Sequence, residues 1–393
     1  MTPPGGIDAS TSPSPSGGAV ARNLTIAAAC IAGAILTAFN VLWARTVLFD
    51  QTFKNDFRLY FGAALVGVQH GWSFIYDPGL QRQAIESLPA GNFQPFVNPP
   101  PMAWLVAPFT AAPFPVALAA WTVLMLGALV ATWWLLVGGD RGERLAHLLL
   151  ALGFLPAGFA LQIGQAVPLI ALAVAISWAL ARRDRTWLAG LALLAIWLKP
   201  QDAILVPLAL LVCGQWRVFA AWATASLVLG AAVLATLGFH GVDAYGQALS
   251  TASQWDLMRR YSLPGQVAPV AASILVATAV LGVTVVLAHR LRGSLDLVVA
   301  AGVAGSLLFS AYLGIQDMVM MLPAAWLVWR HAPGWHRALT VAVYFGIDLG
   351  FVIGPAPVLI AEVAWLASLG FISYGSAAPL SHWRRTADQP ATG

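Results

Sequence analysis

The stretch Asp50–Phe109 reads DQTFKNDFRLYFGAALVGVQHGWSFIYDPGLQRQAIESLPAGNFQPFVNPPPMAWLVAPF and separates two long apolar regions. It concentrates polar chemistry in a chain that is 59% hydrophobic and only 9% charged. Its aromatic residues, among them Tyr60, Trp72 and Tyr76, suit a membrane interface, where amphipathic rings sit at headgroup depth. We therefore expect a loop that lies on the bilayer surface, with Asp56 facing whatever the loop encloses.

Composition places the rest of the chain in a membrane. The mean hydropathy of the 393 residues is +0.77, which is more apolar surface than a soluble domain can bury. The apolar runs are long and unbroken, so helices and not barrel strands are the expected spanning elements. The net charge of +4 comes from short arginine clusters between these runs and does not indicate nucleic-acid binding. Cys30 and Cys213 lie inside apolar runs and support neither a disulfide framework nor a metal site.

The sequence predicts an all-α polytopic membrane protein with a bundle of about twelve transmembrane helices and a large first extracytoplasmic loop. Residues 1–23 are expected to be a disordered cytoplasmic tail, residues 24–375 the transmembrane domain with the loop at 50–112, and residues 376–393 a cytoplasmic tail. The expected spans are 24–49, 115–137, 145–162, 166–181, 186–199, 200–213, 216–238, 267–289, 295–311, 317–330, 338–353 and 356–375.

The arginine clusters support this count through the positive-inside bias, which places Lys and Arg of short loops in the cytoplasm. With twelve spans, the clusters fall on one side with a single exception, the doublet Arg259-Arg260, and both termini lie in the cytoplasm of a plasma (inner) membrane protein. The arginines of the common side are Arg22, Arg141, Arg144, Arg182, Arg183, Arg185, Arg217, Arg290, Arg292, Arg330, Arg337, Arg384 and Arg385. Residues 99–109 form an apolar run of about eleven residues, too short to cross, so an interfacial or re-entrant helix is expected there. A full span at this place would move most clusters to the outside.

The same parity gathers a second set of polar residues on the extracytoplasmic face, among them Lys199 and Asp202. The spans 186–199 and 200–213 are about fourteen residues each, or about 21 Å, against a hydrocarbon core of about 30 Å. A hairpin this short predicts a polar cavity in the outer face, floored by Lys199 and Asp202, and ionisable groups in such places are candidates for function. The alternative is one continuous helix kinked at Pro200, which would bury Lys199 at mid-membrane.

With these pieces placed, the chain resembles the GT-C glycosyltransferases, and within them glycosyltransferase family 87. The resemblance covers about Leu24 to Trp329, and its carriers are short motifs whose order and spacing make it specific. They are Asn55-Asp56 followed by Tyr60, Gly71 to Tyr76-Asp77, Asn98-Pro99-Pro100, Ile163-Gly164-Gln165, Ala189-Gly190 leading to Lys199-Pro200-Gln201, and Tyr312 to Asp317.

This resemblance implies a hexosyltransferase that takes a sugar, mannose in this group, from a polyprenyl phosphate donor in the bilayer. The acceptor would be a hydroxyl group of a glycolipid or glycan on the extracytoplasmic side, and the partners would be the donor, the acceptor and membrane lipids, with no nucleic acid and no cofactor. GT-C enzymes carry an acidic residue in the first outer loop, and Asp56 occupies that position.

The chemistry of such a transfer needs a base for the incoming hydroxyl and positive charge for the departing phosphate. Asp56 is the candidate base in an inverting displacement. The alternative is that Asp56 forms an interfacial ion pair with Lys54 or Arg58.

Lys199 is the first candidate for the phosphate, against the alternatives that it snorkels at a helix end or is neutralised by Asp202. Arg58 is a further candidate, and so are Arg259 and Arg260, whose other explanation is contact with anionic headgroups. Gln165 is expected to bind substrate. Asp317 is expected either to hold a sugar hydroxyl or to cap the helix that begins there.

No His, Cys and carboxylate set has zinc spacing, and nothing in the sequence requires a metal. The alternative function is a secondary transporter of a polar or lipid-linked substrate, which would bind it near the bilayer midplane between repeated halves. The charges of this chain collect at one face, and its two halves show no matching pair of interrupted helices, so transfer is favoured.

Overall fold

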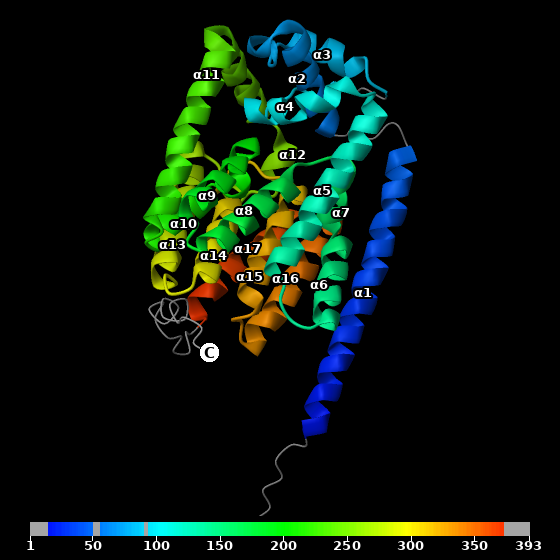
Figure 1. Ribbon diagram of the computed structural model, residues 1–393, viewed down its shortest axis with the longest axis vertical. Helices are drawn as coiled ribbons and strands as arrows, with labels where there is room; N and C mark the ends of the chain where they lie inside the picture. The colour runs from blue at the N-terminus through cyan, green and yellow to red at the C-terminus, as the bar shows by residue number, and fades with distance from the viewer. Residues whose placement is uncertain (1–14, 50–55, 90–92, 373–393) are drawn as a thin grey trace, which may run out of the picture.

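The protein is built of α- and 3-10 helices. A computed structural model describes residues 15–49, 56–89 and 93–372, and these residues contain no β-strand. Among them, five helices are long and apolar enough to cross a bilayer. Outward-facing side chains such as Leu227 and Val270, both 76% exposed, require lipid around them. The five are α1 (Pro15–Phe49), α5 (Phe114–Leu136), α11 (Trp216–Ala252), α13 (Val270–Arg290) and α16 (Gly334–Ile353) (Figure 1).

The remaining apolar helices are shorter and fill the space between the long ones. Those from residue 141 onward are α6 (Arg141–Gly153), α7 (Leu155–Ile163), α8 (Val167–Ala181), α9 (Thr186–Ala192), η3 (Leu193–Leu198), η4 (Pro200–Asp202), α10 (Leu205–Val212), α14 (Leu295–Phe309), η6 (Ile315–Met320), α15 (Met321–Trp329), α17 (Pro355–Ser368) and η7 (Leu369–Phe371). Each predicted span coincides with one or two of the helices. Short helices do not show by themselves which of them cross, so the total of twelve spans stays a prediction.

The bend of 57° between α6 and α7 shows how a broken helix is tolerated in this apolar setting. Pro156 lies at the start of α7 and has no N–H to continue the helix. Asn40 of α1 donates to the carbonyl groups of Leu152 and Phe154, at 2.9 and 3.3 Å, and Asp348 accepts from the Leu155 N–H at 3.0 Å. These three backbone groups at the break are therefore paired, as a membrane interior requires.

The helices between α1 and α5 cover one end of the bundle, and we call them the cap (Figure 1). Its helix α4 has seven residues, which fits the expected interfacial or re-entrant helix within 99–109. Phe57, in the first turn of the first cap helix, is fully buried and stacks on Trp121 of α5 at 5.2 Å. This contact fixes the place where the cap meets the bundle. The cap consists of α2 (Asp56–His70), η1 (Trp72–Phe74), α3 (Pro78–Glu86), α4 (Pro100–Val106) and η2 (Ala107–Ala111).

The segment from α9 to α10 forms the predicted short hairpin. Gly190 of α9 packs against Ala221 near the start of α11, and Trp197 of η3 lies near Gly230 further along α11, so α9 and η3 run parallel to α11. Helix α10 joins α11 through a tight turn at Gly214, which has a φ of 93°. Helix α10 therefore runs in the opposite direction to α9, and Lys199 lies at the tip of the hairpin.

Helices extend into two segments that were not expected to be helical. The connection at 239–266 is largely helical, because α11 continues to Ala252 and is followed by α12 (Asp256–Arg259) and η5 (Pro264–Gln266). Helix α1 begins at Pro15, inside the disordered tail expected at 1–23, and Arg22 there pairs with Asp140 and Glu143. Residues 1–14 and the tail at 376–393 lie outside the described residues.

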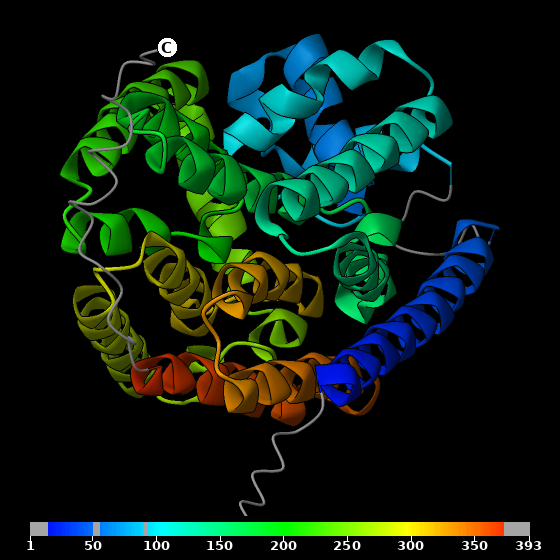
Figure 2. The ribbon, with the colours of Figure 1, turned by 60° about the horizontal axis from the view of Figure 1, so that its bottom comes forward.

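The helix ends beside the described arginine clusters, Arg259 and Arg260 excepted, lie at the end of the bundle away from the cap, which Figure 2 brings forward. Contacts tie several predicted inner loops together there. Besides the Arg22 pairs, Asp296 binds Trp178 and His331, both at 2.7 Å, and Arg330 donates to the Leu136 carbonyl at 2.9 Å. The shared location agrees with the common side assigned to these loops.

Candidate functional site

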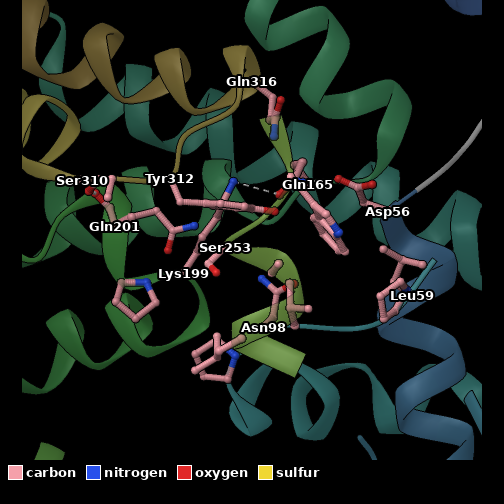
Figure 3. A pocket seen from close by; sticks show the side chains of 18 of the residues that line it. Asp56, Leu59, Asn98, Gln165, Lys199, Gln201, Ser253, Ser310, Tyr312 and Gln316 are labelled. Atoms are coloured by element: carbon pink, nitrogen blue, oxygen red, sulfur yellow. Dashed lines mark hydrogen bonds between the residues drawn. The ribbon is translucent and has the colours of Figure 1, made fainter. Parts of the chain in front are cut away.

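A pocket of about 510 Å³ lies between the cap and the bundle (Figure 3). Its wall combines the first turn of α2, the chain before α4, the tip of the α9–α10 hairpin and the second half of α11. The residues that line it include Asp56, Tyr60, Asn98, Gln165, Lys199, Gln201, Tyr245, Leu249, Ser253, Ser310, Tyr312 and Gln316.

Asp56 is the first residue of α2, and its carboxylate faces the pocket. Gln165 donates a hydrogen bond from Nε2 to Asp56 Oδ2. Burial raises the pKa of Asp56 to about 6, against the lowering effects of the Lys199 charge and the Gln165 hydrogen bond. A carboxylate with a pKa near 6 is ionised at neutral pH and is a better proton acceptor than an ordinary aspartate.

Lys199 owes its position to a break in the helix, where its φ of −157° and ψ of 84° separate η3 from η4. Only 4% of the residue is exposed, which rules out the snorkelling alternative. Its ammonium group forms an ion pair with Asp317 and donates to Gln165 Oε1 at 3.3 Å. Asp202, the alternative partner for this charge, is fully buried and its carboxyl oxygens make no hydrogen bond, so the ion-pair partner of Lys199 is Asp317.

Asp317 lies behind Lys199 and does not line the pocket. Its Oδ2 accepts from the Gly314 N–H at 2.9 Å at the start of η6, so the capping interpretation is correct. Its other oxygen, Oδ1, holds Lys199. The structure therefore places Asp317 as a support for the lysine.

The three candidate arginines are not among the residues that line the pocket. The Arg58 guanidinium lies over the Phe114 ring at 5.5 Å from its centroid. Arg259 and Arg260 follow the pocket residue Trp255, and their carbonyl groups accept from Gln266, at 3.3 Å for Arg259 and 2.6 Å for Arg260. A role for these arginines in binding phosphate stays a prediction.

Sequence reasoning missed several neutral side chains of the pocket as site residues. Tyr60 donates to Gln165 Oε1 at 3.0 Å, and Tyr312, Gln201 and Gln316 line the wall. All four lie in motifs that carry the family resemblance, which was a usable signal. Ser253, at the end of α11, lies in no such motif.

The pocket is nearly neutral. Of its lining residues, Asp56 and Lys199 alone carry a full charge, and the other polar groups are amides and hydroxyls. Within residues 15–49, 56–89 and 93–372, no group of three or more His, Cys, Asp or Glu side chains is placed to hold a metal ion. Such a surface suits a ligand with many hydroxyl groups and one negative charge.

A comparison with protein families decides the class. The family described as glycosyltransferase family 87 matches residues 96–314, which is more than half of the chain. The chain belongs to glycosyltransferase family 87. It is a membrane glycosyltransferase, as the resemblance indicated, and its all-helical fold is consistent with the GT-C group.

The matched range includes only some of the functional candidates of this family 87 protein. Asn98, Gln165, Lys199 and Tyr312 lie within the matched residues, while Asp56 and Asp317 lie outside them. No curated protein and no solved structure matches the chain at a significant level.

Proposed function

We propose that this family 87 protein transfers a hexose, with mannose as the first expectation, from a polyprenyl phosphate sugar to a hydroxyl group of a glycolipid or glycan. The observation that carries the proposal is that one carboxylate and one ammonium group contact opposite ends of the same amide, that of Gln165. Gln165 contacts Asp56 through Nε2 and Lys199 through Oε1, inside one pocket.

The reaction follows from these two charges. The acceptor hydroxyl gives its proton to the Asp56 carboxylate as its oxygen attacks the anomeric carbon of the donor sugar. The bond from that carbon to the phosphate oxygen breaks, and the electron pair leaves with polyprenyl phosphate, which gains a negative charge beside Lys199. Attack opposite to the leaving group inverts the configuration at the anomeric carbon.

The charge of the pocket supports a donor with a single phosphate. A sugar joined to polyprenyl phosphate carries one negative charge, and the pocket wall offers one lysine, itself partly neutralised by Asp317. A nucleoside diphosphate sugar carries two negative charges and a polar base. Among the described residues, the pocket wall has no second cation to pair with the second charge. Apolar residues such as Leu249, beside the polar groups, suit the start of a lipid chain.

The location of the pocket supports transfer on the extracytoplasmic side of a plasma (inner) membrane, with both termini in the cytoplasm. The pocket lies under the cap, and the arginine clusters lie at the opposite end of the bundle (Figure 1). Family membership favours transfer over the transporter alternative.

The proposal is tested by sugar transfer from labelled polyprenyl phosphate mannose in membranes that contain the protein. We expect the wild type to transfer mannose and Asp56→Asn, at matched expression, to lose at least about a hundredfold in rate, because the amide cannot accept the proton. Asp243→Asn, an exposed aspartate on α11, is the matched control and should retain full activity.

The outcomes separate the parts of the proposal. Transfer that survives in Asp56→Asn removes Asp56 as the base. A wild type that is active with another polyprenyl phosphate sugar, but not with mannose, corrects the sugar. A wild type that is inactive with the whole panel of lipid-linked sugars overturns the donor class.

A further inference from the structure

We propose that Gln165 is a positioning residue: it fixes the carboxylate of Asp56 and sets its distance from Lys199, and it does not bind substrate. This inference rests on the proposed function and deepens it, because it assigns the geometry of the base to a residue that the reaction itself does not change.

The orientation of the Gln165 amide is determined by its neighbours. Its Oε1 faces the Lys199 ammonium at 3.3 Å and the Tyr60 hydroxyl at 3.0 Å. An ammonium group has only donors, so the atom opposite Lys199 must be the amide oxygen. The Nε2 group, at the other end, can therefore only point toward Asp56 and donate to it.

The backbone under Gln165 is held as firmly as its side chain. Helix α7 ends at Ile163, and the next residue, Gly164, has a φ of 74° and a ψ of 33°, the left-handed conformation that favours glycine. The Gln165 N–H donates to the Ala160 carbonyl at 2.8 Å, and the Gly164 carbonyl accepts from Trp121 Nε1 at 2.8 Å. Only 4% of Gln165 is exposed.

Trp121 connects this turn to Asp56 by a second route. Its indole ring stacks on Phe57, the residue after Asp56, at 5.2 Å, while its N–H holds Gly164. One fully buried tryptophan thus contacts the chain neighbours of both partners, and the hydrogen bond between Gln165 and Asp56 needs little further ordering on binding.

The arrangement leaves specific atoms free for the reaction. The Gln165 hydrogen bond uses Oδ2 of Asp56, which leaves Oδ1 to accept the proton of the incoming hydroxyl. Lys199 spends two of its three N–H groups on Asp317 and Gln165, which leaves one for the departing phosphate. Figure 3 shows the three side chains in a row across the pocket.

The test compares pH–rate profiles and KM values of Gln165→Leu with those of the wild type. A hydrogen bond to the ionised form lowers the pKa of a carboxyl group. We therefore expect Gln165→Leu to move the acidic limb of the kcat profile upward by about one pH unit. We also expect it to lower kcat about tenfold to a hundredfold, with the donor KM within about threefold.

Gln201→Leu is the matched control, since Gln201 lines the same pocket and makes no hydrogen bond to Asp56. It should change KM and leave the acidic limb in place. An unchanged acidic limb in Gln165→Leu, together with a raised KM, would mean that Gln165 binds substrate and would overturn the inference.

Two further measurements keep the test decisive. If Gln165→Leu does not fold, Tyr60→Phe, which removes one of the two donors to Oε1, should give a smaller shift in the same direction, and no shift contradicts the proposal. The carbonyl stretch of protonated Asp56, identified by its absence in Asp56→Asn, can be titrated by infrared spectroscopy without any substrate. A wild type without transfer activity then counts against the proposed function alone, while equal infrared titrations of wild type and Gln165→Leu count against Gln165.

Discussion

Single residues of this pocket act through partners far away in the chain. Lys199 had an acidic residue three positions away, Asp202, but the structure pairs it with Asp317, 118 residues on. Asp317 was available because the Gly314 N–H already fixes its other oxygen at the start of η6. A carboxylate held at two points loses little side-chain entropy when it binds a cation, which explains why the distant partner is used.

The base assigned to Asp56 carries a pH dependence that can be measured. Burial raises its pKa to about 6, and a base works only when it is deprotonated, so the transfer rate should fall as pH drops through about 6 and stay level above it. The measurement is kcat for sugar transfer between pH 4.5 and 8, with donor and acceptor saturating. An acidic limb near pH 4, the range of an ordinary aspartate, would show that Asp56 is not buried during the reaction or is not the base.

At the scale of elements, helix α11 is divided at Gly238 into a membrane-spanning part and a part that lines the pocket. Gly238 has a φ of 59° and a ψ of −174°, a conformation that other residues strongly disfavour. Before it, the helix is an apolar span; after it, Tyr245, Leu249 and Ala252 line the pocket. Tyr245 also stacks on Tyr76 of the cap at 4.5 Å. The break therefore lets one helix both cross the membrane and form a wall of the site.

We predict that Gly238→Ala destabilises this wall. A methyl group meets no atom within 4 Å there, so the cost of about 1–3 kcal/mol comes from the backbone conformation alone. The expected result is a donor or acceptor KM raised several-fold, together with a lower midpoint of thermal unfolding in detergent. Gly246→Ala is the matched control: Gly246 lies in the helical second half of α11, also with open space, and alanine should be neutral or slightly stabilising there. Equal behaviour of the two variants would show that the bend at Gly238 can relax without effect.

Sequence reasoning predicted the apolar helices because a bilayer demands long apolar runs, and it predicted the hairpin at Lys199 from the shortness of two such runs. It missed the helix beyond Gly238, where polar residues such as Asp243 interrupt the apolar pattern. The inward face at positions 245, 249 and 252 has helical spacing, a signal that was present but weak. Asp56, Lys199 and Gln165 were expected at the site separately. Their connection through one amide depends on three elements that meet in space, which no local pattern indicates.

The whole molecule places its pocket and its arginine clusters at opposite ends, which makes a topological prediction. Ser87 lies exposed in the cap, and Gly293 lies exposed between α13 and α14, next to Arg292. With Cys30 and Cys213 replaced by alanine, Ser87→Cys should react with a membrane-impermeant maleimide added outside intact cells. Gly293→Cys should react only after the membrane is opened. Labelling of both variants from the same side would contradict the assigned orientation.

The short α9–α10 hairpin has a consequence for the surrounding lipid. Its first helical arm, α9 with η3 (Thr186–Leu198), is thirteen residues long, or about 20 Å. This arm carries the exposed side chains of Trp187 and Leu191. Acyl chains beside it must shorten or tilt to match this height, at a cost of a fraction of a kcal/mol for each ångström of hydrophobic mismatch. We therefore expect long, saturated acyl chains to match this hairpin, with Lys199 at its tip, less well than short or unsaturated ones. Membrane thickness thereby becomes a variable that acts on the site from outside.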